Sequence, residues 1–216
     1  MNRYRITFTR DQSVRFVGHL DLVKTWERIL QRADLPVAYS QGFHPLPRIT
    51  FASALPVGCT SEAELMDVVL TEPLDPSIMI QRLMPVLPAG IGIASIVEVP
   101  LNAPALQAEL RWAEYLVTLE TDEPQAQIEA KVQSLVAAVT LPRERRGKNY
   151  DLRPLVLGLA IESVPPSVQL VMRLRADATA GTGRPDEVLA VLGLGDAPTQ
   201  IHRRALGFVA AVEFSV

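Results

Sequence analysis

The sequence has little of what several classes of protein require. Among its 216 residues there is one cysteine, Cys59, which excludes a disulfide framework within the chain and any metal or cluster site built on several thiolates. The longest uncharged apolar stretch, residues 83–97, is broken by two prolines and two glycines. It is also shorter than the roughly 20 apolar residues that a membrane-spanning helix needs. Arg3, Arg5 and Arg10 interrupt the apolar residues of the N-terminal segment, so we expect no secretory signal there. We therefore expect a cytoplasmic protein with no membrane partner.

The charge is balanced overall but unevenly distributed. Hydrophobic residues make up 48% and charged residues 21%, as in a folded globular protein, and the net charge of −3 argues against a cationic coat for nucleic acid. The balance is +4 over residues 1–50, −9 over 51–140 and +2 over 141–216. Of the 21 basic residues 18 are arginine, whose guanidinium can form two parallel hydrogen bonds to a phosphate and can stack on a base. Two basic regions therefore flank an acidic middle.

The hydrophobic pattern of the first half predicts a βαββαβ order. Residues 4–9 alternate like a half-buried strand, and a short second strand is expected at 14–17. Apolar residues at three- and four-residue spacing over 22–33 predict a helix, with Asp21 or His19 as its N-cap. Strands at 48–53, 64–71 and 91–99 and a helix opening at Pro76 complete the set. This is the ferredoxin-like order, whose crossovers place both helices on one face of the sheet.

The same order recurs in the second half. We expect a strand at 113–120, a helix at 124–139, a hairpin of 155–164 with 168–175 around Pro165-Pro166, a short helix after the turn at 181–185, and a strand at 205–214. The predicted fold class is α+β, with two tandem ferredoxin-like (βαββαβ) units. The first unit is 1–100, a linker covers 101–110, and the second unit is 111–216.

The loop at residues 38–48, AYSQGFHPLPR, is the first candidate site. Gly42 permits a positive φ and Pro45 favours an extended His44, so aromatic and basic side chains would stand on a stiff loop beside a sheet edge. Such side chains can stack on and clamp nucleotides. The alternative is that Tyr39 and Phe43 cover the core. With two cations of the preceding helix, the candidate nucleic-acid-binding residues are Arg28, Arg32, Tyr39, Phe43, His44 and Arg48.

A second candidate is a run of five basic residues within eleven positions. Arg146 and Gly147 are typical of an exposed turn, a natural place for a phosphate contact. Because Glu144 and Asp151 dilute the charge, a solvated face is the alternative. Phosphate contacts would make the affinity fall steeply with salt. The candidates are Arg143, Arg145, Arg146, Lys148 and Arg153.

The three histidines show no metal-ligand spacing, and the chain has neither a P-loop nor a dinucleotide-binding fingerprint after a strand. We expect no metal and no cofactor. A metal-independent endoribonuclease with His19 or His44 as general base is one alternative. The other interpretation of His19 is structural, because the residues around it can cap a helix. We expect the chain not to be an enzyme.

Residues 16–64 carry a long ordered pattern: H-L-D-L, then E-R-x-L-x-R-A, then L-P-x-A-Y-S-x-G-F-x-P, then F-A-x-A-L-P-x-G. This pattern resembles the radical SAM-associated (radical SAM-linked) domain family of uncharacterised bacterial proteins, and GKNYDLRPLV at 147–156 resembles that family's later segment. The matching positions include His19, Asp21, Tyr39, Ser40, Gly42, Phe43 and Pro45.

The resemblance implies a role beside a radical SAM enzyme, fused to it or encoded near it, with RNA as the substrate. Because such enzymes hold a cluster on three closely spaced cysteines, the partner would have to supply the cluster. The leading hypothesis is an accessory module of a radical SAM system that binds structured RNA or presents a substrate, with both basic regions facing one groove. The further alternative is a protein-interaction adaptor that docks on the radical SAM enzyme through a sheet edge or the loop at 38–48.

Overall fold

A computed structural model describes residues 1–164 and 167–208 and divides the chain into two compact units, Met1–Glu109 (unit 1) and Leu110–Val216 (unit 2). Both contain helices and mainly antiparallel strands, so the predicted α+β class is confirmed. No helix within the described ranges is long and apolar enough to cross a membrane.

Unit 1 has a four-stranded antiparallel sheet. Its strands are β1 (Asn2–Arg10), β2 (Ile49–Phe51), β3 (Thr60–Leu70) and β4 (Ile91–Val99), in the order β4-β1-β3-β2. Strand β1 alternates as the sequence predicts, because Tyr4, Ile6 and Phe8 are buried on one face. Its Arg3 and Arg5 project from the opposite face.

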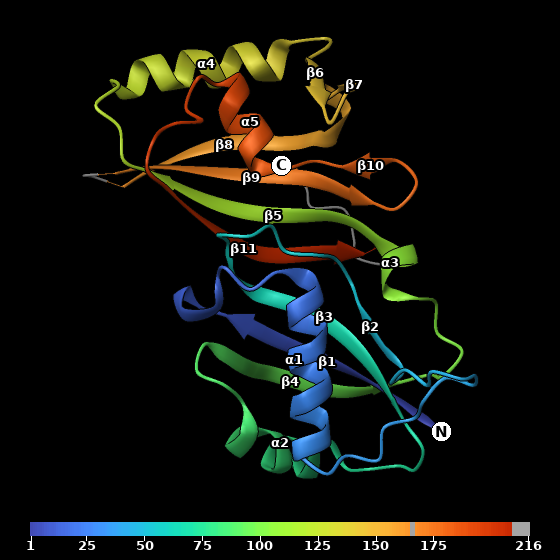
Figure 1. Cartoon of the computed structure of the whole chain (residues 1–216). Coiled ribbons are helices and arrows are strands. Elements are labelled where there is room, and N and C mark those ends of the chain that lie inside the picture. Colours follow the sequence, from blue (N-terminus) through green and yellow to red (C-terminus); the bar gives the residue numbers. More distant parts are fainter. Residues whose placement is uncertain (165–166, 209–216) are drawn as a thin grey trace. The chain divides into compact units, whose positions relative to one another are not determined.

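The two main helices of unit 1, α1 (His19–Arg32) and α2 (Pro76–Leu83), cover the face that carries Tyr4, Ile6 and Phe8 (Figure 1). The rings of Phe8 and Trp26 meet edge to face with centroids 5.0 Å apart. The N-cap of α1 is Gly18, which has no side-chain cap, so the expectation of Asp21 or His19 is wrong. The prediction of a strand at 14–17 is also wrong. Residues Gln12–Val14 form the 3-10 helix η1 instead, and Asp11 caps it.

The opposite face of unit 1 holds a buried ion-pair cluster. Asp67, only 3% exposed, accepts from Arg3 at 2.5 Å and from Arg5 at 2.9 Å. Arg3 also donates to the carbonyls of Ala103 and Pro104. The segment 101–110, expected as a linker, is thus tied to the sheet and contains the helical turn α3 (Leu106–Glu109), whose Leu106 is buried.

Unit 2 repeats the scheme with an insertion. Its strands β5 (Leu110–Leu119), β8 (Val156–Val164), β9 (Ser167–Asp177) and β11 (Thr199–Phe208) form the antiparallel order β8-β9-β5-β11, and β10 (Gly181–Thr182) pairs with the end of β9. The helices are α4 (Gln125–Ala137), which contacts β8, and α5 (Pro185–Val191), which lies in front of β8 and β9 in Figure 1. Between α4 and β8 the chain forms a separate hairpin of β6 (Pro142–Arg145) and β7 (Lys148–Asp151), followed by the 3-10 helix η3 (Arg153–Leu155).

The closing strand of unit 2 begins earlier than expected. Strand β11 starts at Thr199, so the six residues before 205 belong to it, while the expected strand residues 209–214 lie outside the described residues. The antiparallel pairing of β8 with β9 confirms the expected hairpin, although its turn at 165–166 also lies outside them.

Candidate nucleic-acid interface

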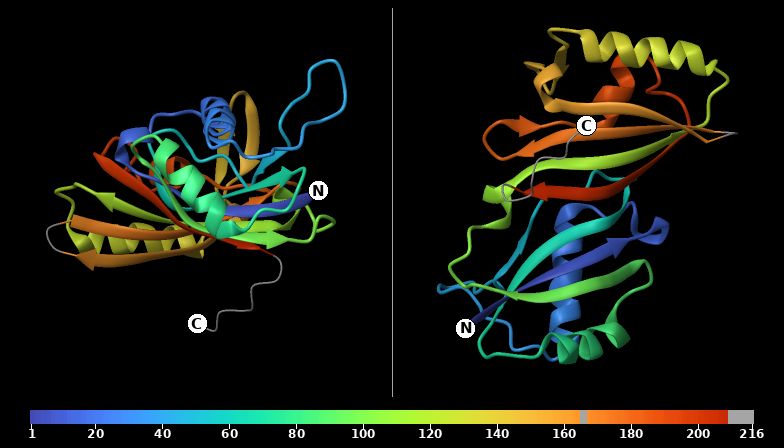
Figure 2. Two further views of the ribbon diagram at one scale, coloured as in Figure 1. Left: turned by 90° about the horizontal axis from the view of Figure 1, so that it is seen from below. Right: turned by 180° about the vertical axis from the view of Figure 1, so that it is seen from behind.

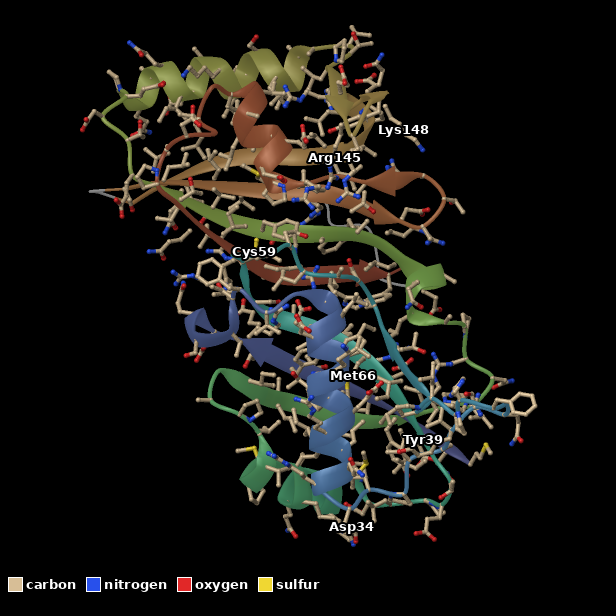
Figure 3. All side chains as sticks on the ribbon, viewed as in Figure 1. Asp34, Tyr39, Cys59, Met66, Arg145 and Lys148 are labelled. Carbon is tan, nitrogen blue, oxygen red and sulfur yellow. The ribbon has the colours of Figure 1, made fainter. Side chains whose placement is uncertain are left out.

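The β6–β7 hairpin sorts its charges by face. Arg143 lies opposite Tyr150, and Arg145 lies opposite Lys148. Residues directly opposite each other share a face of an antiparallel pair, as do residues two apart in one strand. Both cross-strand pairs therefore share one face, and Glu144 projects from the other. Figure 3 shows Arg145 and Lys148 on this hairpin.

The turn of the hairpin places a further cation at its tip. Arg146 and Gly147 are the two central residues, with φ values of 51° and 73°. Positive φ at both positions is the type I′ geometry that fits the twist of a two-residue hairpin. Asparagine is favoured at the first position, and a residue with a long side chain there costs roughly 1–2 kcal/mol. Arg146 is therefore held in a strained conformation on an exposed tip.

Three of the hairpin cations are uncompensated. Arg143 is paired, because its Nε lies 2.9 Å from a carboxylate oxygen of Glu187. For Arg145, Arg146 and Lys148, the described part of the chain offers no hydrogen bond or ion pair to their side chains. The hairpin, defined by residues 142–151, thus presents three unpaired positive charges within four positions.

Arg153, also predicted to bind nucleic acid, has a structural task instead. Its guanidinium donates to the carbonyls of Val136, Ala138 and Val156 at 2.8–3.1 Å. The first two belong to the end of α4, where a cation satisfies unpaired carbonyls and complements the helix dipole. Asp151 fixes the hairpin base, because its Oδ1 accepts the N–H of Leu141 at 2.7 Å and that of Arg153 at 2.9 Å. That Arg153 also contacts nucleic acid stays a prediction.

A cavity of about 480 Å³ opens in unit 2 beside the hairpin. Burial raises the pKa of the Tyr150 hydroxyl, and the charge of Glu187 and a hydrogen bond to it raise it further. Sequence reasoning missed Tyr150, Arg184 and Glu187, because they come together only when the hairpin packs beside α5. The lining residues are Arg145, Tyr150, Asp151, Pro154, Leu155, Ala180, Gly181, Thr182, Arg184 and Glu187.

The loop at 38–48 in unit 1 exposes its aromatic side chains. Phe43 is fully exposed and Tyr39 is 51% exposed, so the alternative that they cover the core is wrong. The base of the loop is closed by two backbone bonds of 2.8 Å, from the Ser40 N–H to the Leu46 carbonyl and from the Arg48 N–H to the Ala38 carbonyl. Figure 2 shows this loop, in light blue, projecting from unit 1 in its left view. Gly42 has a φ of 135°, as the sequence predicts for a glycine turn.

The other predicted cations of unit 1 line two smaller hollows. Arg28 and Arg32, exposed one turn apart on α1, line a cavity of about 420 Å³ together with residues 85–88. Arg48 lines one of about 200 Å³ that also contains Arg3 and Asp67. The predicted residues therefore fall on α1 and the 38–48 loop of unit 1 and on the hairpin of unit 2. That both sets face one groove stays a prediction.

The two candidate general bases lie in different settings. His19 begins α1, is half-buried, and meets the ring of Phe51 edge to face with centroids 5.6 Å apart. His44 is exposed on the 38–48 loop. A role for either in RNA cleavage stays a prediction. Within the described residues no group of three His, Cys, Asp or Glu side chains is arranged to hold a metal ion.

Residues 3–185 match the model of a family described as an uncharacterized protein conserved in bacteria, DUF2344. The chain belongs to this family. The match covers most of unit 1 and reaches past the hairpin to the start of α5, so the 38–48 loop and the cations at 143–148 both lie within it. No curated protein matches the chain.

Among solved structures, the fold resembles a crystal structure of a Cbf5–Nop10–Gar1 complex, with a TM-score of 0.53 and 11% identity over 94% of this chain and 49% of that one. An archaeal box H/ACA sRNP Nop10–Cbf5 complex gives 0.46 and 12% over 93% and 46%. An unknown protein from Galdieria sulphuraria gives 0.26 and 13% over 94% and 98%. The chain spans about half the length of the first two chains, and the likeness to the first concerns the fold alone.

Proposed function

We propose that the chain is an RNA-binding accessory module in which the β6–β7 hairpin contacts phosphates. The observation that carries the proposal is the group of unpaired cations Arg145, Arg146 and Lys148 around one strained turn. Phosphate contacts fix the position of a protein on nucleic acid without reading its sequence. We therefore expect structured RNA to bind with an affinity set mainly by charge.

The hairpin face that carries Arg145 and Lys148 is arranged to bind a polyanion rather than to be exposed only to water. Arg145 and Lys148 lie directly opposite each other, and like charges in that position repel. The adjacent Glu144 projects from the other face and relieves little of this repulsion. A bound backbone phosphate would halve the net charge of the pair and so relieve its repulsion, whereas a merely solvated face gains nothing from placing two cations opposite each other.

The exposed loop of unit 1 supplies a second kind of contact. Phe43 and Tyr39 offer ring faces to solvent, and Arg48 at the end of the loop is also exposed. Stacking of a base on an aromatic ring contributes about 1–3 kcal/mol and tolerates every base. Charge from the hairpin and stacking from the loop are together the contacts of a protein that binds RNA with little sequence preference.

Salt titration tests the proposal. With a labelled RNA hairpin, the logarithm of the affinity should fall linearly with the logarithm of salt, with a slope of about −0.7 to −0.9 per phosphate contact. The double variant Arg146→Asn with Lys148→Ala should bind more weakly and have a slope shallower by about 1.4–1.8, if both cations contact phosphates. Arg146→Asn keeps the turn, because asparagine tolerates its positive φ.

The matched control removes the same two charges elsewhere. Arg82→Ala with Lys131→Ala changes the net charge equally, and both side chains already have partners, the Asp34 carbonyl and Glu123. The control should retain the wild-type slope. Equal slopes for the wild type and the hairpin variant, or no salt-dependent binding by the wild type, would refute the proposal.

We propose further that the module works with a radical SAM enzyme. Docking of the 38–48 loop on that enzyme is the alternative to base stacking by the same loop. The ordered motif over residues 16–64 supports this, and the loop within it exposes Phe43 and Leu46 to solvent. The enzyme would supply the cluster, since Cys59 is this chain's single cysteine and is buried. If the loop docks, co-purification with a radical SAM protein after ribonuclease treatment should be lost in Phe43→Ser and kept in Lys148→Ala. Loss in neither variant contradicts docking by the loop.

Finally, we propose that each unit is a ferredoxin-like domain, with the boundary near residues 101–110. The strand orders β4-β1-β3-β2 and β11-β5-β9-β8 support this, because each follows from a βαββαβ chain with its two helices as crossovers. An experimental structure with a parallel neighbour pair in either sheet would contradict it.

A further inference from the structure

The cavity of about 480 Å³ in unit 2 has firm walls. One wall is the β9–β10 turn, where Asp177 Oδ1 accepts the N–H groups of Thr179 at 2.8 Å and Ala180 at 2.9 Å. Gly181 follows with a φ of 101°, and a Cβ there would lie 3.2 Å from Leu155, which also lines the cavity. The hairpin wall is fixed at its base by the bonds of Asp151. The cavity is therefore preformed.

The charges around the cavity are compensated with one exception. Glu187 accepts from Arg143, and Tyr150 forms a further hydrogen bond with it. Arg184 pairs with Asp186 at 2.8 Å. Arg145 is the lining cation that has no partner in the described residues. A ligand that enters would thus meet one unpaired guanidinium, the carboxylates of Glu187 and Asp151, and apolar surface from Pro154 and Leu155.

We infer that this cavity binds a single nucleotide of the RNA, with the phosphate on Arg145 and the base inside. This inference rests on the proposed RNA-binding function and specifies which part of the RNA the hairpin region takes up. The volume lies within the range of about 300–1,000 Å³ that is typical of small-ligand sites. A nucleotide combines the three features that the lining calls for: an anionic group, a flat apolar body, and N–H donors on one edge of that body.

The carboxylate determines which bases fit. Glu187 can only accept hydrogen bonds when ionised, so it favours a base with an exocyclic amino group, as when a carboxylate accepts from the N4 amino group of cytosine. Uracil has a carbonyl oxygen at that position, which would face the carboxylate as a second acceptor. The cavity should therefore select cytosine over uracil.

The test uses the whole chain with cytidine 5′-monophosphate, uridine 5′-monophosphate and cytidine as probes, followed by calorimetry or protein NMR. We expect saturable binding of the cytidine nucleotide, at least about tenfold tighter than that of either other probe, a difference of about 1.4 kcal/mol. Arg145→Ala should abolish the advantage of the nucleotide over the nucleoside. Glu187→Gln should abolish the preference for cytosine over uracil, because an amide can donate to the uracil oxygen.

Arg82→Ala is the matched control. It removes a guanidinium of unit 1 that donates to the Asp34 carbonyl and does not line the cavity, so mononucleotide binding should stay unchanged. Since Glu187 also holds Arg143, the folded state of each variant is checked by its thermal transition, and Arg145→Ala keeps the test decisive if Glu187→Gln unfolds. Absence of saturable mononucleotide binding, or equal binding by Arg145→Ala, overturns the inference.

The two proposals fail separately. RNA binding with a normal salt slope but without mononucleotide binding would remove the cavity as a nucleotide site and leave the hairpin as a phosphate contact. Mononucleotide binding without salt-dependent RNA binding would remove the RNA-binding function and show a small-molecule site. Each result is read from the wild-type chain alone, before any variant is made.

Discussion

Replacing Arg146 by asparagine should make the protein more stable and bind RNA less tightly. Arg146 sits at the first central position of a type I′ turn with a φ of 51°, where asparagine is the favoured residue. The left-handed conformation costs a residue with a long side chain roughly 1–2 kcal/mol, and asparagine recovers about half of it. We therefore expect unit 2 to gain about 0.5–1 kcal/mol, which corresponds to about 2–4 °C in the melting temperature of a domain of this size.

The assay is thermal or urea unfolding of Arg146→Asn beside Lys148→Asn. The control loses the same charge and gains the same residue one position beyond the turn, where Lys148 already lies in β7. If relief of backbone strain is the cause, Arg146→Asn is stabilised and Lys148→Asn is not. Equal gains in both would mean that charge repulsion, rather than φ, explains the effect. No gain in Arg146→Asn would refute the strain argument. Strain kept at an exposed cation is expected where the side chain has a task in binding.

Three further predictions concern the fold and its titrating groups. Asp67→Ala should destabilise unit 1 by about 3–5 kcal/mol in urea unfolding, because it leaves Arg3 and Arg5 without their shared buried partner. The pKa of Asp177 is lowered from 3.8 to about 2, chiefly by hydrogen bonds from Ala180 and Thr179. Its ionised form therefore stabilises the fold fully above pH 4, and this contribution is lost as the pH falls toward 2. In Asp177→Asn, the free energy of unfolding should fall less steeply between pH 4 and pH 2. The pKa of Tyr150 is raised above 10.0, chiefly by burial and also by Glu187, although Arg143 and Arg145 act to lower it. Glu187→Gln should therefore lower the midpoint of its ultraviolet titration.

The elements that local pattern specifies were predictable from the sequence. The alternation over residues 4–9 and the three- and four-residue spacing over 22–33 gave β1 and α1 within a few residues, because each pattern records one buried face. The N-cap of α1 was not predictable in this way, since Gly18 has no side chain to signal it. The segment between Pro100 and Pro104 indicated a linker over 101–110, whereas Arg3, a hundred residues away, donates to its Ala103 and Pro104 carbonyls.

The candidate site was predictable in part. A basic run was visible in the sequence, but the sorting of Glu144 away from Arg145 and Lys148 required the register of the hairpin. The one local signal was the Arg146-Gly147 pair, which marks a two-residue turn once the flanking residues are taken as strands. Arg153 shows that a count of charges is not enough, because two of its three carbonyl partners, Val136 and Ala138, lie at the end of α4, fifteen or more residues away. The Glu187 wall of the cavity depends on contacts between segments more than thirty residues apart and leaves no local trace.

The two candidate regions occupy the same place in the order of their units. In unit 1 the 38–48 loop follows α1 and precedes β2; in unit 2 the β6–β7 hairpin follows α4 and precedes β8. Each is an extension between the first helix and the second long strand of a βαββαβ sequence, and each turns at a glycine with positive φ, Gly42 or Gly147. An extension at this point leaves the crossover helix and the sheet unchanged, so it can acquire binding residues without cost to the core. Their side chains differ: the loop offers rings, and the hairpin offers cations.

This equivalence predicts how the two regions contribute to RNA binding. Phe43→Ala should weaken binding by the loss of one stacking contact, about 1–3 kcal/mol, and leave the salt slope unchanged, because no charge is removed. Lys148→Ala should change the slope. Since the two residues belong to different units, their effects on the free energy of binding should add within about 0.5 kcal/mol in the double variant. If the double variant instead binds no more weakly than the worse single variant, the loop and the hairpin do not contact the RNA independently. In that case the proposal that each unit contributes its own extension is wrong, even if the hairpin alone binds phosphate.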